Sequence, residues 1–304
     1  MAMRDVLGAA VVLGALAAPV AAGNDTAAIR KVLDAQVKAI SRHDGPAFAA
    51  TFAPTIYAML PGGYATSASS AGKGAARGWW GADMMHVTAK ARVAKAVIGQ
   101  AGERAWITAD LTLSEVSAED GSKGPDEAYR VTELLVRQKG AWKVHATYWS
   151  QAVPDEPGAW ANTILDGDDG MPDGDPTPGN GAPGAAWAAK PADLAAHLRG
   201  GKDVVVLGSA PRERGEGPAA ATLLAGWKRI AFDVDWLRAG GDGTSYAWVA
   251  GRISRGVKDR EQGTIHEPYW MMVLLVKGAS DWEVVSAHYG QTSPAAGLEH
   301  GDGE

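Results

Sequence analysis

A helical spacing of apolar residues is the first clear pattern along the chain. Apolar side chains recur three or four positions apart at Ile29, Val32, Leu33, Val37 and Ile40. This spacing predicts an amphipathic helix that Asn24 or Asp25 can cap and that ends near Ser41. A short helix at 44–52, a strand at 56–60 and a second short helix at 75–84 are expected next.

Four long strands follow in the first half of the chain. They are expected at 86–98, 105–115, 127–139 and 141–151. Lys139-Gly140 predicts a tight hairpin between the last two. The second half has a similar order, with helices at 191–198 and 218–228 and strands at 203–207, 230–237, 245–254, 269–277 and 282–291. Because helices and strands are segregated, the sequence predicts an α+β fold with helices packed on a curved antiparallel sheet.

The two halves are predicted to be copies of one domain. A shift of 140 residues aligns 127–151 with 267–291 without a gap, and 8 of the 25 pairs are identical, including Trp142 with Trp282. Between the copies the chain is rich in Pro, Gly and Asp, which is typical of a flexible linker. The expected organisation is a signal peptide at 1–22, a first domain at 23–152, a linker at 153–184, a second domain at 185–294 with a reduced first helix, and a tail at 295–304.

The first 22 residues have the pattern of a signal peptide. Arg4 gives a positive start, a run of apolar and small residues covers 6–20, and Val20-Ala21-Ala22 offers small residues at the cleavage position. The run is shorter than the ~20 apolar residues of a membrane-spanning helix, and a retained N-terminal anchor is the alternative. We therefore expect a periplasmic or secreted protein with no membrane span in the mature chain.

Composition argues against several kinds of partner and chemistry. The formal net charge is −6, so the chain has no basic excess for nucleic acid. It has no cysteine, which removes disulfides, thiolate metal sites and cysteine nucleophiles. The acidic stretch 166–170 fails the spacing of an EF-hand loop, so a solvated linker is the simpler interpretation and calcium the alternative. Asp83, His86 and His145 share no tight ligand spacing, and we expect neither a metal nor a cofactor.

Three blocks of sequence carry a family resemblance: Phe52-Ala53-Pro54 with the strand at 56–60, Ala105-Trp106, and 134–149. Together with the order of helices and strands, they resemble the cone-shaped fold of nuclear transport factor 2 and the SnoaL-like polyketide cyclases. The resemblance covers most of the first copy and the later part of the second. It implies a pocket enclosed by the sheet and the helices, which enzymes, ligand binders and protein-binding modules of this fold all use.

The ketosteroid isomerases of this fold offer a comparison for acid/base chemistry. The resemblance places their general-base Asp at Leu60 in the first copy and near Leu207 in the second. It places their buried acid at Thr132 and Met272. None of these side chains can act as a carboxyl group does, so we expect both halves of that scheme to be missing.

Polar residues inside strands remain as candidates for catalysis. They are Asp110, Glu133, Tyr148 and His288. Because strand side chains alternate between faces, each lies either in the pocket or on the outer face of its sheet. Tyr148 and His288 hold the same position in the two last strands, and we expect His288 to share a face with Trp282 and Val284.

Aromatic residues supply candidates for a ligand pocket. The chain has 12 Trp against 3 Phe. The candidates are Tyr57, Trp79, Trp80, Trp227 and Trp236, together with His288. Indole rings in the region that closes the pocket suit a flat apolar or sugar-like ligand, and a core filled with Trp is the alternative.

These observations favour an exported, non-catalytic module with a pocket for a small molecule or a partner. The alternative is a cofactor-independent acid/base enzyme, of isomerase, cyclase or dehydratase type, acting on a small organic substrate. The stretch 269–276 is apolar at every position, which predicts that both faces of this strand are covered. We therefore expect the two copies to pair through their sheets within one chain, with a homodimer as the alternative.

Overall fold

The computed structural model describes residues 25–61, 63–79, 87–117, 119–124, 126–152, 183–227, 230, 232–259 and 263–291. The expected signal peptide, nearly all of the linker and the tail lie outside these residues. Elements of the first half are α1 (Thr26–Ile40), α2 (Gly45–Ala49), β1 (Phe52–Leu60), β2 (Gly63–Ser67), α3 (Ala68–Trp79), β3 (Val87–Ala101), β4 (Arg104–Ser117), β5 (Glu127–Gln138) and β6 (Ala141–Gln151). Those of the second half are α4 (Ala185–Ala188), α5 (Pro191–Ala196), β7 (Val205–Leu207), β8 (Arg214–Glu216), α6 (Pro218–Gly226), β9 (Asp233–Gly241), β10 (Tyr246–Asp259), β11 (Gly263–Lys277) and β12 (Trp282–Gly290).

Each half folds around one six-stranded sheet, and the two sheets have the same strand order. The first runs β2-β1-β6-β5-β4-β3 and the second β8-β7-β12-β11-β10-β9. Neighbouring strands are antiparallel except that β1 is parallel to β6 and β7 is parallel to β12. The α+β fold and the internal repeat are thus confirmed, with mixed sheets in place of fully antiparallel ones.

Local sequence explains how the helices and turns form. Helix α1 buries the expected stripe, with Ile29 and Leu33 fully enclosed. Asp44 caps α2 by accepting a hydrogen bond from the Ala47 N–H at 2.8 Å. Lys139 and Gly140 both have positive φ, 50° and 82°, as a two-residue hairpin between twisted strands requires.

A β-bulge in the last hairpin of each half decides which face the side chains take. The register shifts between Leu134 and Leu135 and again between Leu274 and Leu275. As a result two consecutive residues, Val285 and Ser286, both lie on the side that faces the first sheet, whereas Val284 packs on the helix side. The expectation that His288 shares a face with Trp282 and Val284 was therefore wrong, because the bulge interrupts the alternation between them.

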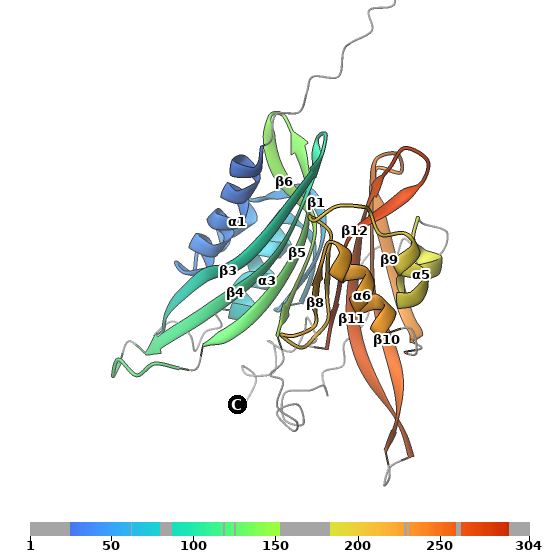
Figure 1. Ribbon diagram of the computed structural model, residues 1–304. Helices are drawn as coiled ribbons and strands as arrows, with labels where there is room; N and C mark the ends of the chain where they lie inside the picture. The colour runs from blue at the N-terminus through green and yellow to red at the C-terminus, as the bar shows by residue number, and fades with distance from the viewer. Residues whose placement is uncertain are drawn as a thin grey trace, which may run out of the picture.

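The apolar side chains form three cores. One lies between the first sheet and its helices, one between the second sheet and its helices, and the third between the two sheets. Figure 1 shows the sheets face to face, with α1 on the far side of the first and α5 on the far side of the second. Strand β11 contributes Met271 and Val273 to the second core and Trp270 and Met272 to the third, so both of its faces are covered.

In both sheets a tryptophan lies across a glycine of the next strand. Trp106 pairs with Gly99, and Trp248 pairs with Gly240. A Cβ atom on Gly99 would lie 2.1 Å from Trp106 Cε2, and one on Gly240 would lie 2.5 Å from Trp248 Cζ2. The absence of a side chain at each glycine thus lets the indole lie flat on the face that meets the other sheet.

Candidate functional site

Glu133 is the one catalytic candidate that lies on the helix side of the first sheet. Gln36 of α1 donates its Nε2 to Glu133 Oε1 at 2.9 Å, and Thr147 of β6 donates its Oγ1 to the same oxygen at 3.3 Å. The carboxyl group is fully buried. Burial raises its pKa from the ordinary 4.5 to about 7, against the lowering effect of these hydrogen bonds.

The surroundings of Glu133 fit a neutral carboxyl group. The Trp149 side chain is a third hydrogen-bond donor beside the carboxyl group and lowers its pKa as Gln36 and Thr147 do, whereas Gln36 Oε1 has no hydrogen-bond donor among the described residues. A protonated carboxyl group brings an O–H donor of its own, whereas a carboxylate only accepts. We therefore take Glu133 to hold a proton inside the cone up to about pH 7.

The two positions of the first half that correspond to the carboxyl groups of the ketosteroid isomerases, Leu60 and Thr132, carry no carboxyl group. Leu60 and Thr132 are both fully buried and neither ionises in this range. Thr132 pairs with Tyr148 and faces the second sheet, while its neighbour Glu133 points into the cone. The expectation that the buried acid is missing was therefore wrong for the first half, because Glu133, one residue after Thr132, is a buried acid. The corresponding residue of the second half is the apolar Val273.

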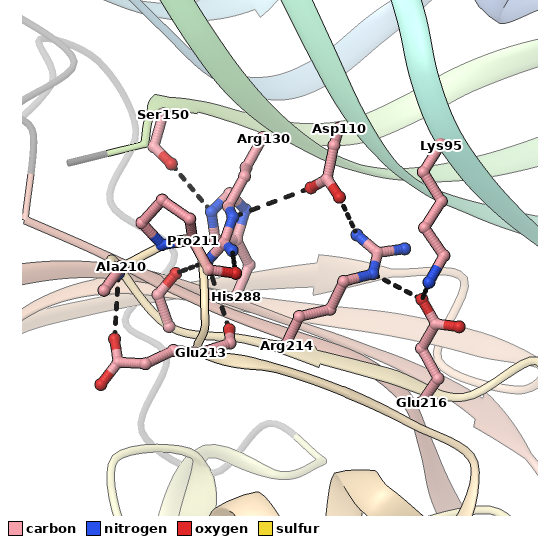
Figure 2. Close-up of polar contacts among 11 residues, drawn as sticks. Lys95, Asp110, Arg130, Ser150, Ala210, Pro211, Glu213, Arg214, Glu216 and His288 are labelled. Carbon is pink, nitrogen blue, oxygen red and sulfur yellow. Dashed lines mark hydrogen bonds and ion pairs between the residues drawn. The ribbon is translucent and has the colours of Figure 1, made fainter. Parts of the chain in front are cut away.

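Asp110 lies on the opposite face of the first sheet, where it contacts the second half (Figure 2). Its Oδ2 accepts a hydrogen bond from Arg214 NH1 at 2.9 Å, and its Oδ1 lies 3.7 Å from Arg130 Nε. Arg130 also donates to the carbonyl oxygens of Gly208 and Pro211, at 2.5 and 2.7 Å. Asp110 therefore joins the two sheets and does not face a pocket of the first domain.

A second ion pair extends this network. Lys95 Nζ lies 2.7 Å from Glu216 Oε1, the oxygen that Arg214 Nε also contacts. Every charged side chain of the group thus meets an opposite charge or a carbonyl oxygen from the other half (Figure 2). We call this group the charged corner, and its members are Lys95, Asp110, Arg130, Arg214 and Glu216.

Tyr148 and His288 meet between the two sheets. Their ring centroids are 4.3 Å apart, and Ser150 Oγ lies 2.9 Å from His288 Nε2. Both rings are fully buried. Burial, followed by the nearby charges of Arg130 and Arg214, holds the pKa of His288 well below 6.5, so the imidazole is neutral. These two candidates pack the halves together and lie on the other side of the sheet from Glu133.

Tyr57 and Trp236 also lie between the sheets. Tyr57 stacks on Trp248 with centroids 4.4 Å apart, and Trp236 meets Tyr64 edge-on at 5.8 Å. Both belong to the third core, so they do not line a pocket inside one cone.

Trp227 lies on the helix side of the second sheet. It is half-buried and meets Tyr289 edge-on at 5.6 Å. Trp79 ends α3, but its side chain and the whole of Trp80 lie outside the described residues. The sequence candidates therefore divide among the first cone, the inter-sheet layer and the second cone.

A groove that the sequence analysis did not indicate runs along the first half. It encloses about 1530 Å³ between α2, α3 and the β5–β6 hairpin. Its walls are mostly apolar and its charged or titratable members are His43, Lys73, Lys139 and Lys143. Little in the sequence indicates this groove, because of its charged residues only Lys139 and Lys143, in the β5–β6 hairpin, are close together in the chain.

The described part of the chain contains no group of three or more His, Cys, Asp or Glu side chains that could hold a metal ion. None of its helices combines the length and apolar character needed to span a bilayer.

Two six-stranded sheets of identical order, each with helices on one face, define a tandem α+β protein. Residues 29–154 match the family model of the SnoaL-like domain, so the first half of the chain carries a domain of that kind. A comparison with curated protein sequences found no match.

Solved structures give further likenesses. A ketosteroid isomerase-like protein from Erwinia carotovora atroseptica is 20% identical over 42% of this chain and 97% of its own, with a TM-score of 0.34. A protein of unknown function with a cystatin-like fold from Nostoc punctiforme is 17% identical over 44% and 92%, with a TM-score of 0.35. A hexachlorocyclohexane dehydrochlorinase is 15% identical over 42% and 84%, with a TM-score of 0.36. At these values the likeness carries no argument about activity.

Proposed function

We propose that the protein is an exported, non-catalytic binding protein that holds a small amphipathic anion in the groove of its first half. The observation that supports this most is the lining of the groove. Lys73, Lys139 and Lys143 line otherwise largely apolar walls, and no acidic residue is among the lining residues that the structure describes. An apolar body with an acidic head complements such a surface.

The dimensions of the groove favour an elongated ligand. Its volume of about 1530 Å³ exceeds the ~300–1,000 Å³ of common small-molecule pockets. Lys143 donates to the Ala50 carbonyl oxygen, which fixes its ammonium group at the wall. An ammonium group has three donors, so it retains hydrogens for a ligand. A fatty acid is the simplest molecule with this shape and charge.

The distribution of titratable groups supports binding over catalysis. Acid/base catalysis requires groups that converge on one substrate. Glu133 lies inside the first cone, whereas Asp110 and His288 lie between the sheets. Gln36, Thr147 and Trp149, the described side chains that hydrogen-bond Glu133, have no acid/base function near neutral pH.

Calorimetric titration with dodecanoate and with dodecanol tests this proposal. We expect dodecanoate to bind more tightly than the neutral alcohol, and Lys73→Ala or Lys139→Ala to weaken it about threefold to tenfold. Lys90→Ala is the matched control, because Lys90 is an exposed residue of β3 outside the groove. Equal binding of acid and alcohol, or an equal loss in Lys90→Ala, would show that the groove does not select an anion.

A catalytic alternative rests on Glu133 alone. A buried acid with a pKa of about 7 suits proton transfer near neutral pH, as a cofactor-independent enzyme on a small organic substrate requires. Deuterium exchange from D₂O into cyclohex-3-enone provides a simple probe of such transfer. Exchange that the protein accelerates and that Glu133→Gln abolishes would favour the enzyme. Dodecanoate binding that Glu133→Gln leaves unchanged, without any exchange, would favour the binding protein.

Export belongs to the same proposal. The sequence pattern of residues 1–22 supports cleavage before Gly23. N-terminal sequencing of protein from the native host checks this, and a cytosolic protein that starts at Met1 would contradict it.

A further inference from the structure

The interface between the sheets has two corners that the internal repeat relates. Lys95, Asp110 and Arg130 form a cross-strand row on β3, β4 and β5. The equivalent row of the second half lies on β9, β10 and β11 and consists of Trp236, Arg252 and Trp270. The repeat thus places two aromatic residues and one cation where the first half has three charges.

The residues that face each row also differ. Arg214 of β8 faces the first row and pairs with Asp110 at 2.9 Å. Its counterpart in the first half is Tyr64, since Tyr64 pairs with Met59 on β1 as Arg214 pairs with Leu207 on β7. Tyr64 meets Trp236 edge-on at 5.8 Å. Aromatic rings and cations therefore occupy this corner of the interface, whereas ion pairs occupy the equivalent, charged corner. We call it the aromatic corner, and its members are Tyr57, Tyr64, Trp236, Arg238, Arg252 and Trp270.

Three buried donors of the aromatic corner lack an acceptor among the residues that the structure describes. Trp236 Nε1, Trp270 Nε1 and Tyr57 Oη are buried and have no hydrogen-bond partner among the described residues. Their side chains are 8%, 0% and 6% exposed. An indole N–H can only donate, so neither indole can satisfy the other. Buried donors in folded proteins are nearly always paired, and an unpaired group calls for a water, an ion or a ligand.

Two cations lie over the rings of this corner. Arg238 lies over the ring of Trp236 at 5.8 Å, and Arg252 lies over Trp270 at 5.6 Å. Asp235 Oδ2 lies 3.3 Å from Arg252 Nε. Arg252 and Asp235 are 33% and 35% exposed, so they form the solvent-facing rim of the corner.

We propose that the aromatic corner is a binding site for a small aromatic carboxylate. The carboxylate oxygens accept from the indole N–H groups and the Tyr57 hydroxyl, while the flat ring lies among aromatic faces. Arg252 at the rim supplies the charge that draws the anion in. This site is separate from the groove of the first half and does not depend on the function proposed for that groove.

Nuclear magnetic resonance of ¹⁵N-indole-labelled protein tests the proposal with benzoate as the probe. We expect the Trp236 and Trp270 indole signals to shift saturably, with a Kd on the order of 1 mM for so small a ligand. Trp106 is the internal control, because its Nε1 already donates to the Asp203 carbonyl at 2.8 Å and its signal should not move. Trp→Phe variants assign the signals.

Matched ligands and variants distinguish an anion site from a corner that holds only a buried water. Benzamide has the same shape as benzoate without the charge and should shift the two signals at least tenfold more weakly. Arg252→Gln, at the half-exposed rim, should weaken benzoate about tenfold with the fold intact, whereas Lys73→Ala in the groove should have no effect. The proposal is overturned if the signals do not move, if benzamide acts like benzoate, or if Arg252→Gln binds normally, since a buried water alone would then account for the donors.

Discussion

At the scale of single residues, Glu133 links the stability of the first half to pH. Its pKa rises from 4.5 to about 7 on folding because the carboxyl group is buried against α1. Between these values the folded state keeps a proton that the unfolded state has lost. The free energy of unfolding therefore falls as pH rises through this window, by about 3 kcal/mol in total.

Glu133→Gln should remove this pH dependence. Glutamine has the same shape and remains uncharged, so we expect the variant to match the wild type at pH 4 and to be more stable at pH 8 by up to about 3 kcal/mol. Urea unfolding at a series of pH values measures the difference. Glu127→Gln, at the half-buried start of the same strand, is the control and should follow the wild type. A variant less stable than wild type at pH 8 would contradict a neutral Glu133.

The paired tryptophans Trp142 and Trp282 should differ in their contribution to stability. Sequence alone predicts equivalent burial, but Trp142 is 6% exposed whereas Trp282 is half-buried at the margin of its core. Trp142→Ala should therefore cost about 3–5 kcal/mol, and Trp282→Ala about half as much. Chemical denaturation measures both, and equal losses would mean that the reduced helices of the second half cover Trp282 in solution.

At the scale of elements, the long strands and α1 follow directly from the sequence. Their apolar period is regular over many residues, as it is from Ile29 to Ile40. The short strands β2 and β8 were missed, because Gly, Ser and charged residues give them no alternation. The bulges were missed for a different reason, since they depend on pairing between strands. One extra residue at each bulge places Tyr148 and His288 on the inter-sheet side, opposite to the face that strict alternation from Trp142 and Trp282 predicts.

The glycine and tryptophan pairs of the sheets give a prediction at this scale. Gly99→Ala would place a Cβ 2.1 Å from the Trp106 ring, which is fully buried between the sheets. We expect overpacking to cost about 1–3 kcal/mol. Gly226→Ala is the control, since no atom lies within 4 Å of its new Cβ. Thermal unfolding should show a lower midpoint for the first variant only, and a neutral result would mean that the indole can rotate away.

At the scale of the whole molecule, the two sheets bury apolar side chains against each other. Trp106 and Trp270 are both fully enclosed in this layer. Apolar burial of this kind is the main driving force of association. One chain thus covers the surface that would otherwise require a second copy.

We expect the mature protein to sediment as a compact monomer at all concentrations. The inter-sheet face is occupied within the chain, so little apolar surface is left for a second copy, and Val234 is the exposed large apolar side chain of the described residues. Analytical ultracentrifugation over a hundredfold range of concentration tests this. A dimer that dissociates on dilution would favour exchange of halves between chains.

Tyr148 and His288 occupy the same place in the two copies and meet each other across the interface. In a dimer of identical chains, two-fold symmetry would place two tyrosines or two histidines there, and every substitution would appear twice. A single chain that contains both copies is free of this restriction, because a mutation in one copy leaves the other unchanged. One side of the interface can then acquire a new specificity while the other continues to hold the halves together.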